Sequence, residues 1–289
     1  MAESALVIGV DSPGASRRQL VVVRPSRDGV SLGLAELWKH RRLLRLFVWR
    51  DVKVRYKQTA LGAGWALLQP FLTMLVFTFV FGRLAKVPSN GIAYPVFVFA
   101  GLLPWQFFVQ SLVRASNTLV QERYLLTKVY VPRLILPVSA VLSGLPDFGV
   151  AFFVLLALMI HYRIHATFAI FAVPPLLLLA AATSLCASLF LATLNVRYRD
   201  VGLTIPFFSQ LWFFVTPVAY PSSMVPDRWR LLYGINPMAG VMEGFRWAVL
   251  GIRTATWPLI FVSAAVIGCL LVLGLFYFER MDKSFADVV

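Results

Sequence analysis

The chain has 289 residues, of which 59% are hydrophobic and only 14% are charged, and its mean hydropathy is +0.77. Soluble domains carry about 25% charged residues, so this composition excludes an ordinary soluble protein and indicates a membrane protein. The net charge of +14 resides mainly in the flanks of apolar runs, which favours membrane topology and anionic lipid over nucleic acid as its cause.

The first 64 residues precede the first long apolar run. Residues 1–30 have no apolar core of signal-peptide length after a basic start, so they are predicted to be a cytoplasmic N-terminal extension. Residues 31–64 are predicted to be an amphipathic interface helix with a connection, and the alternative is a soluble tether that only supplies positive charge. The apolar stripe of this helix comprises Leu34, Leu37, Leu44, Val48 and Val52.

Six apolar stretches follow, each with few or no charges over the roughly 20 residues that a helix needs to cross a hydrocarbon core of about 30 Å. Lipid offers backbone groups no hydrogen-bond partner, so each stretch is predicted to be a helix. The predicted spans are residues 65–82, 92–113, 134–160, 166–196, 201–220 and 254–278. We therefore expect an all-α integral membrane domain with six transmembrane helices at 65–278 and a cytoplasmic tail at 279–289.

The basic residues predict the orientation of these spans. Twenty of the 27 Lys and Arg lie before the first span, in the loops after spans two and four, or after the last span. The other seven lie on the opposite side. By the positive-inside rule, both termini are predicted to be cytoplasmic.

Within the predicted spans, Asp147 is the only ionisable residue well inside the membrane, where a charge costs a few kcal/mol. A packing role beside Pro146 is favoured over a role in transport, since no other Asp, Glu or His accompanies it. Two cysteines, Cys186 and Cys269, lie in apolar runs, and the three histidines have no ligand spacing. The sequence therefore predicts no disulfide, no metal site and no cofactor in this chain.

Two segments between spans carry more than a simple loop needs. Residues 121–133 mix basic with apolar residues, which is typical of either a partner surface or an interfacial loop that holds orientation. Residues 221–253 are predicted to form two short helices, either re-entrant or lying on the membrane surface. In the second of these, Glu243 and Arg246 are spaced i,i+3 and are expected to pair.

Aromatic residues gather in the predicted outer halves of spans two and five. Lipid contact and core packing account for most aromatic residues in membrane proteins. Flat aromatic faces also suit the apolar C–H faces of sugar rings, so these residues are candidates for lining a sugar channel. They are Trp105, Phe107, Phe108, Phe207, Phe208, Trp212, Phe213 and Phe214.

Six stretches of the chain, in order, carry a further signal. They are WRDVKVRYKQTALGAGWALLQP (49–70), YPVFVFAGLLPWQFF (94–108), KVYVPRLILPVSAVLSGLPDF (128–148), NVRYRDV (195–201), FFVTPVAYPSSMVP (213–226) and INPMAGVMEGFRWAVLG (235–251). In collinear order, these stretches resemble the permeases of bacterial polysaccharide exporters in the ABC-2 superfamily, which serve O-antigen, teichoic acid and related polymers. The resemblance covers roughly residues 35 to 280.

This resemblance implies a homodimer in the bacterial inner membrane that binds two copies of a cytoplasmic ATPase and exports a lipid-linked glycan. MgATP would bind the partner, since this chain has no phosphate-binding G-x-x-x-x-G-K-[ST] motif. The resemblance implies ATPase coupling by Glu122, Arg123, Lys128, Tyr130 and Arg133, and an outer gate with Asn236, Pro237, Glu243 and Arg246. Basic residues positioned to meet the anionic head of the lipid carrier are Arg42, Arg45, Arg50, Lys53, Arg55 and Lys57.

Three alternative functions remain open. A capsular-polysaccharide exporter and an ABC-2 drug exporter share the six spans. A membrane glycosyltransferase or acyltransferase requires acid and base residues paired at the membrane surface. Asp51, Asp200 and Asp227 are instead scattered along the chain, which disfavours the enzyme.

Overall fold

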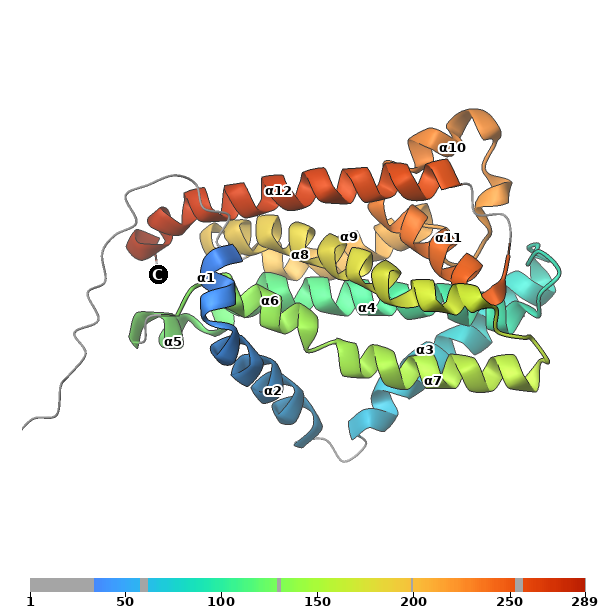
Figure 1. Cartoon of the computed structure of the whole chain (residues 1–289), viewed down its shortest axis with the longest axis horizontal. Coiled ribbons are helices and arrows are strands. Elements are labelled where there is room, and N and C mark those ends of the chain that lie inside the picture. Colours follow the sequence, from blue (N-terminus) through green and yellow to red (C-terminus); the bar gives the residue numbers. More distant parts are fainter. Residues whose placement is uncertain (1–33, 58–61, 129–130, 199, 253–256, 289) are drawn as a thin grey trace, which may run out of the picture. The chain divides into compact units, whose positions relative to one another are not determined.

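The computed structural model describes residues 34–57, 62–128, 131–198, 200–252 and 257–288. In these ranges the chain forms helices joined by turns and short extended segments, without a strand (Figure 1). The all-α prediction is therefore confirmed for the described part of the chain. The predicted N-terminal extension at residues 1–30 lies outside it.

Four helical stretches are long and apolar enough to cross a membrane, namely Tyr94–Gln121, Ile135–His161, Phe168–Arg197 and Trp257–Met281. They correspond to the predicted spans two, three, four and six. The first is helix α4 (Tyr94–Gln121) and the second comprises α6 (Ile135–Leu142) and α7 (Leu145–His161). The third is a 3₁₀ turn (Phe168–Ala172) with α8 (Val173–Arg197), and the fourth belongs to α12 (Trp257–Val288).

The predicted spans one and five fall on shorter apolar helices. Helix α3 (Gly62–Phe77) continues into a π-helical turn (Thr78–Leu84), and α9 (Asp200–Val215) has 16 residues. At 1.5 Å per residue, α9 is about 24 Å long, which is less than a typical hydrocarbon core. Pro217 follows shortly after its end and cannot continue the helical hydrogen bonding. Four candidate spans are thus established in the described residues, and the count of six remains a prediction.

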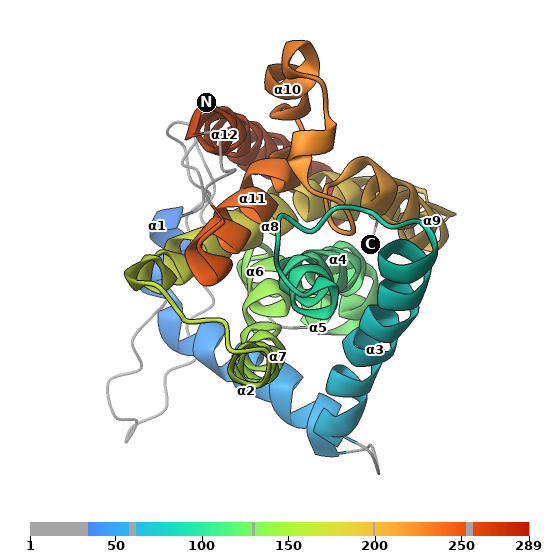
Figure 2. The same cartoon turned by 90° about the vertical axis from the view of Figure 1, so that its right-hand side faces the viewer.

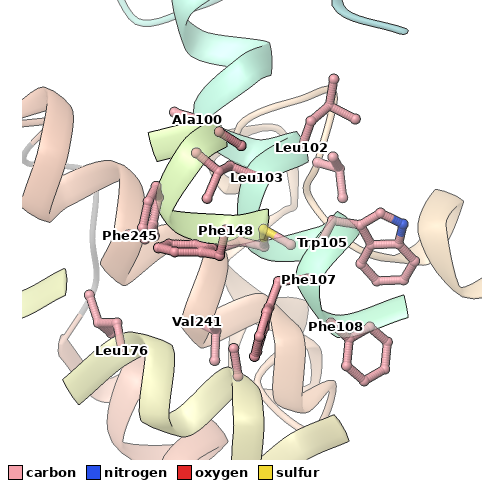
Figure 3. Packing of buried hydrophobic residues seen from close by; sticks show 14 of the residues in the cluster. Ala100, Leu102, Leu103, Trp105, Phe107, Phe108, Phe148, Leu176, Val241 and Phe245 are labelled. Carbon is pink, nitrogen blue, oxygen red and sulfur yellow. The ribbon is translucent and has the colours of Figure 1, made fainter. Parts of the chain in front are cut away.

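Helix α4 lies at the centre of the bundle, with α3, α6, α7, α8, α9 and α11 (Pro237–Leu250) packed around it (Figure 2). Residues 96–105 of α4 are all buried. A helix enclosed on all sides has no need of a polar face, which explains the even apolarity of its first half. Figure 3 shows Trp105, Phe107 and Phe108 of α4 among Phe148 of α7 and Phe245 of α11.

The third predicted span is divided at Ser143 and Gly144, where α6 ends and α7 begins. Pro146 occupies the first turn of α7, where its missing N–H removes no helical hydrogen bond. The proline thus marks a helix start within the membrane segment. This break brings Gly144 and Asp147 to one corner of the bundle, facing α4.

The predicted amphipathic segment folds as α1 (Leu34–Lys39) and α2 (Arg41–Lys57). Leu37, Leu44, Val48 and Val52 of its apolar stripe are half-buried. Phe47 is buried in a cluster with residues of α6, α8 and α12. Trp49 and Leu46 remain about two-thirds exposed. Helix α2 therefore packs one face on the protein and presents a second apolar face to its surroundings.

Two short α-helices connect the longer ones. Helix α5 (Arg123–Lys128) follows α4 directly, and α10 (Asp227–Tyr233) precedes α11. The two short helices predicted between residues 221 and 253 thus correspond to α10 and α11. Helix α11 is buried along nearly its whole length, whereas Trp229 and Leu232 of α10 are exposed.

Close packing of α11 on α12 yields a first stability prediction. A Cβ at Gly240 would lie 2.5 Å from the Cβ of Ser263, so Gly240→Ala is expected to destabilise the protein by about 1–3 kcal/mol through overpacking. The matched control is Gly268→Ala on α12, where no heavy atom lies within 4 Å of an added Cβ. Denaturation midpoints in detergent measure both effects, and equal midpoints for the two variants would contradict the prediction.

Candidate functional site

Asn236 forms hydrogen bonds that join three parts of the chain, namely α9, the turn that follows it, and α11. Its Oδ1 accepts hydrogen bonds from the backbone N–H of Met238 at 3.2 Å and from Nε1 of Trp212 at 3.0 Å. Its Nδ2 donates to Oγ1 of Thr216 at 3.0 Å. Asn236 is therefore the N-cap of α11, and Pro237 occupies the first helical position.

Glu243 and Arg246 form an ion pair inside the protein. Their nearest N and O atoms are 3.7 Å apart, and the two side chains are only 3% and 2% exposed. Arg246 also donates to the carbonyl oxygens of Val218 and Tyr220, while Glu243 accepts from the backbone N–H of Ser222. The pair thus fastens α11 to the segment that follows α9.

The close approach of α4 to this ion pair depends on a glycine. The guanidinium of Arg246 lies over the ring of Phe97, 3.9 Å from its centroid. A Cβ at Gly101 would lie 2.6 Å from the carbonyl oxygen of Val218 and 2.7 Å from Arg246. The predicted gate residues Asn236, Pro237, Glu243 and Arg246 therefore all lie on or at the start of α11, where they connect it to the chain after α9.

At the other end of the bundle, Asp147 is bound by two residues of α2. Arg55 forms an ion pair with it and Tyr56 donates its hydroxyl to it. Arg55 also donates to the backbone oxygen of Ser143 at 3.2 Å and to its Oγ at 3.0 Å. Burial, followed by the hydrogen bond to Asp147, raises the pKa of Tyr56 to about 12, so its hydroxyl is a donor at neutral pH. These bonds attach α2 to the start of α7.

A second set of ionic contacts attaches α2 to the end of α4. Arg50 contacts Asp51 at 2.9 Å and Glu122 at 2.6 Å, and Ser139 of α6 donates to Asp51 at 3.3 Å. Burial lowers the pKa of Arg50, but its bonds and attraction to the two carboxylates outweigh burial and raise it. Glu122, predicted to serve coupling, is thus held by Arg50 at the junction of α4 and α5.

The six basic residues predicted to meet a lipid head divide into two sets. Arg50 and Arg55 are half-buried and paired with carboxylates, which sequence alone did not indicate. The other four are exposed on α2, and they are Arg42, Arg45, Lys53 and Lys57.

The predicted coupling residues lie on and around α5. Lys128 is exposed and lies over the ring of Tyr124, 4.1 Å from its centroid, and Tyr124 is itself 70% exposed. Arg123 begins α5, Arg133 follows it in a turn, and Tyr130 lies outside the described residues.

The eight candidate channel aromatics also divide into two sets. Trp105, Phe107 and Phe108 belong to the buried core around α4. Trp212 and Phe213 are half-buried against them. Phe207, Phe208 and Phe214 of α9 are each about 60% exposed. Of the eight candidates, these last three are the ones whose rings are mostly exposed in the single chain.

Two asparagines missed by the sequence reasoning join α8 to its neighbours. Asn195 donates to the backbone oxygen of Ser116 at 3.2 Å and to Oδ1 of Asn117 at 3.0 Å, and accepts from the N–H of Gly202 at 2.9 Å. Asn195 is the first residue of the stretch NVRYRDV. These hydrogen bonds give a structural role to the first position of that stretch. In the described ranges, no group of three or more His, Cys, Asp or Glu is arranged to hold a metal ion.

The family model for the ABC-2 type transporter matches residues 42–250. The O-antigen export system permease protein RfbA of Myxococcus xanthus is 32% identical over 88% of this chain and 98% of its own length. A protein of the same name from Klebsiella pneumoniae is 26% identical over 86% of this chain and 95% of its own length. The polysialic acid transport protein KpsM of Escherichia coli is 23% identical over 70% of this chain and 78% of its own length.

Proposed function

Because the chain belongs to the ABC-2 type transporter family, we propose that it is the permease subunit of an ATP-driven exporter of lipid-linked polysaccharide of the O-antigen type. The observation that carries this proposal is the 32% identity to an O-antigen export permease across nearly the whole length of both chains. Similarity of that extent covers the N-terminal helices, the bundle and α11 together.

A capsular polysaccharide is the second candidate substrate. The relative named for polysialic acid transport supports it, but at 23% identity and over a smaller share of both chains. An ABC-2 drug exporter remains the third candidate, and a membrane glycosyltransferase or acyltransferase is the least favoured. The O-antigen type is preferred because those relatives match more of this chain.

In this proposal the chain crosses the bacterial inner membrane six times with both termini in the cytoplasm. The four long helices supply four crossings, and α3 with its π-helical turn and α9 supply the other two. The excess of basic residues before the first crossing supports the orientation. On this topology α5 faces the cytoplasm, while α10 and α11 form a re-entrant pair at the outer side.

Two copies of the chain are proposed to form the pore. Helices α3 and α9 meet where the rings of Phe77 and Phe213 lie 5.5 Å apart. Next to this contact, Phe79 of the π-helical turn and Phe214 of α9 are more than half exposed. An extended apolar face of this kind suits a second copy of the same helices, and Phe207, Phe208 and Phe214 would then face the glycan path.

The energy for transport is proposed to come from two ATPase subunits that bind MgATP. The exposed Tyr124 and Lys128 of α5 are suited to docking such a partner. Helix α5 begins directly after Glu122, and Glu122 binds Arg50 of α2. A displacement of α5 by the ATPase would therefore be transmitted to α2 through this ion pair. In this proposal ATP hydrolysis takes place on the partner subunits, and this chain acts as the permease.

The test is to purify the chain with the ATPase encoded beside it, reconstitute both in liposomes, and follow ATP hydrolysis with and without polyprenyl-linked glycan. A stable complex of two permeases and two ATPases whose hydrolysis rises with glycan is the expected result. If the chain associates with no nucleotide-binding subunit, the proposal fails and a stand-alone transporter or membrane enzyme is favoured instead.

A further inference from the structure

A cleft between α3, α4 and α7 has one polar end and one apolar end. Its polar lining consists of Gln106, Gln110 and Arg114 of α4 with Asp147 of α7. The apolar part is lined by side chains that include Leu103 and Phe99 of α4. Gln106, Gln110 and Arg114 follow one another at intervals of four residues, which places them on one face of α4.

Arg114 lacks strong partners for its charge. Its guanidinium donates to Oε1 of Gln110 at 3.4 Å and to Oγ of Ser111 at 3.5 Å, both longer than the 2.7–2.9 Å or so of a charge-assisted hydrogen bond. Its Nε is buried without a hydrogen-bond partner. Among the described residues, no carboxylate lies within 4.0 Å of Arg114. A half-buried guanidinium with a buried Nε and weak hydrogen bonds is suited to an anionic ligand.

Arg114 is the charged residue of the cleft lining that has no direct ion pair. Asp147 is the carboxylate that lines the cleft, and Asp147 is already paired with Arg55 and hydrogen-bonded by Tyr56. The guanidinium of Arg114 is therefore the group that an anionic ligand could pair with directly. The first turn of α7, which begins without a side-chain cap, also lines the cleft and adds the positive end of a helix dipole.

A glycine lets Arg114 occupy this position. A Cβ at Gly144 would lie 2.6 Å from a terminal nitrogen of Arg114 and 3.1 Å from Oγ of Ser111. Any other residue at 144 would displace the guanidinium. Phe107 and Phe148 also line the cleft, and their rings, 5.9 Å apart, lie close together in Figure 3.

The depth of the cleft distinguishes a lipid from a soluble anion. Arg114 follows Tyr94 by 20 residues along α4, which is about 30 Å at 1.5 Å per residue and equals the thickness of a hydrocarbon core. Arg114 thus lies at a membrane border, Gln110 and Gln106 lie one and two turns deeper, and Leu103 and Phe99 lie deeper still. This gradient matches an amphiphile with an anionic head and a hydrocarbon chain.

We propose that this cleft binds a phosphate-bearing membrane lipid, with the phosphate at Arg114 and the hydrocarbon chain along Leu103 and Phe99. The identity of the lipid rests on the proposed function. It is the polyprenyl phosphate or diphosphate carrier of the glycan, taken from the cytoplasmic leaflet. Gln106 and Gln110 donate to the same head, and Asp147 orients the site through Arg55 and Tyr56.

The test measures binding of polyprenyl monophosphate to the purified permease–ATPase complex by native mass spectrometry. Arg114→Gln is expected to weaken binding by about tenfold or more, since it removes a charge-assisted contact, and Arg114→Lys is expected to fall between this variant and the unaltered chain. Arg83→Gln removes an exposed charge elsewhere and is expected to leave binding unchanged.

A second pair of variants changes position without changing charge. Gly144→Ala is expected to weaken binding by displacing Arg114, whereas Gly149→Ala on the same helix, with nothing within 4 Å of an added Cβ, is the matched control. Equal binding by the unaltered chain, Arg114→Gln and Gly144→Ala would overturn the site.

Competition identifies the ligand. Inorganic phosphate or phosphatidylglycerol that displaces the polyprenyl phosphate at equal concentration would overturn the assignment to a carrier lipid, and failure of both to compete supports it. The outcome is separable from the proposed function, because binding is read without transport. A complex that hydrolyses ATP in response to glycan but binds carrier independently of Arg114 would refute this site alone, whereas Arg114-dependent binding by a permease that recruits no ATPase would refute the exporter alone.

Discussion

Glu243→Gln is expected to lower the free energy of unfolding by about 3 kcal/mol, because it leaves Arg246 as a buried charge without a counter-charge. Both side chains are at most 3% exposed, so water does not screen the loss. Glutamine keeps the shape of Glu243 and can still accept from the N–H of Ser222. The denaturation midpoint in detergent, followed as sodium dodecyl sulfate is added, measures the change.

A double-mutant cycle separates the ion pair from general disruption. Arg246→Met leaves Glu243 unpaired and deprives the carbonyl oxygens of Val218 and Tyr220 of a donor. The double variant with Glu243→Gln is expected to be more stable than the sum of the single losses implies, by about 1 kcal/mol or more. Arg228→Gln on the exposed surface of α10 is the control. Strict additivity would mean that the two side chains do not interact.

Asp147→Asn is expected to lower the free energy of unfolding by about 2 kcal/mol and to weaken the attachment of α2 to the start of α7. The pair that it forms with Arg55 is partly exposed, at 13% and 28%, so the cost falls below that of a fully buried pair. Arg55 would retain its bonds to Ser143, and the lost charge weakens its hold on α7. Glycan-stimulated ATP hydrolysis in the reconstituted complex and thermal stability measure the two effects.

The matched control for Asp147 is Asp200→Asn, which neutralises an exposed carboxylate at the start of α9. Its expected cost is below about 1 kcal/mol, the size of a helix-dipole contact at a surface. If Asp147→Asn behaves like this control, Asp147 does not act as an ionised partner of Arg55. A packing role beside Pro146, as the sequence favoured, would then account for the residue.

Composition and run length predicted the all-helical membrane class and the positions of the four long stretches, because about 20 apolar residues suffice to identify a span. Span ends were less predictable. Helix α4 continues to Gln121, eight residues past the predicted end at 113. Polar residues can extend a helix when they face protein, and the buried Ser116 and Thr118 do so by bonding to backbone oxygens of their own helix.

Contacts between distant residues could not be read from the sequence. Asp147 was recognised as exceptional, but its partner Arg55 is 92 residues away and carried only the signal of a basic surface helix. Arg50 and Glu122 are separated by 72 residues. By contrast, Glu243 and Arg246 are one turn apart on one helix, so their pairing followed from spacing and is confirmed.

The sequence of α4 contains a pattern that indicates the Arg114 cleft. Gln106, Gln110 and Arg114 repeat every four residues along an otherwise apolar helix. A polar stripe on a buried helix has to face a ligand, water or another polar group. The aromatic candidates show the limit of composition, since Trp105, Phe107 and Phe108 have the composition of a sugar-binding surface and lie in the core of this chain. Composition alone does not distinguish a lining residue from a packing residue.

The burial of α11 restricts how the outer end of the protein can move. Arg246 ties it to the chain after α9, Gly240 lies against Ser263 of α12, and Asn236 caps its first turn. In mechanical terms, α11 is part of the rigid frame of the bundle. In the proposed pore of two copies, a change of shape at this end is therefore expected to move α10, or one whole copy against the other, in the manner of two rigid bodies that separate along a shared seam.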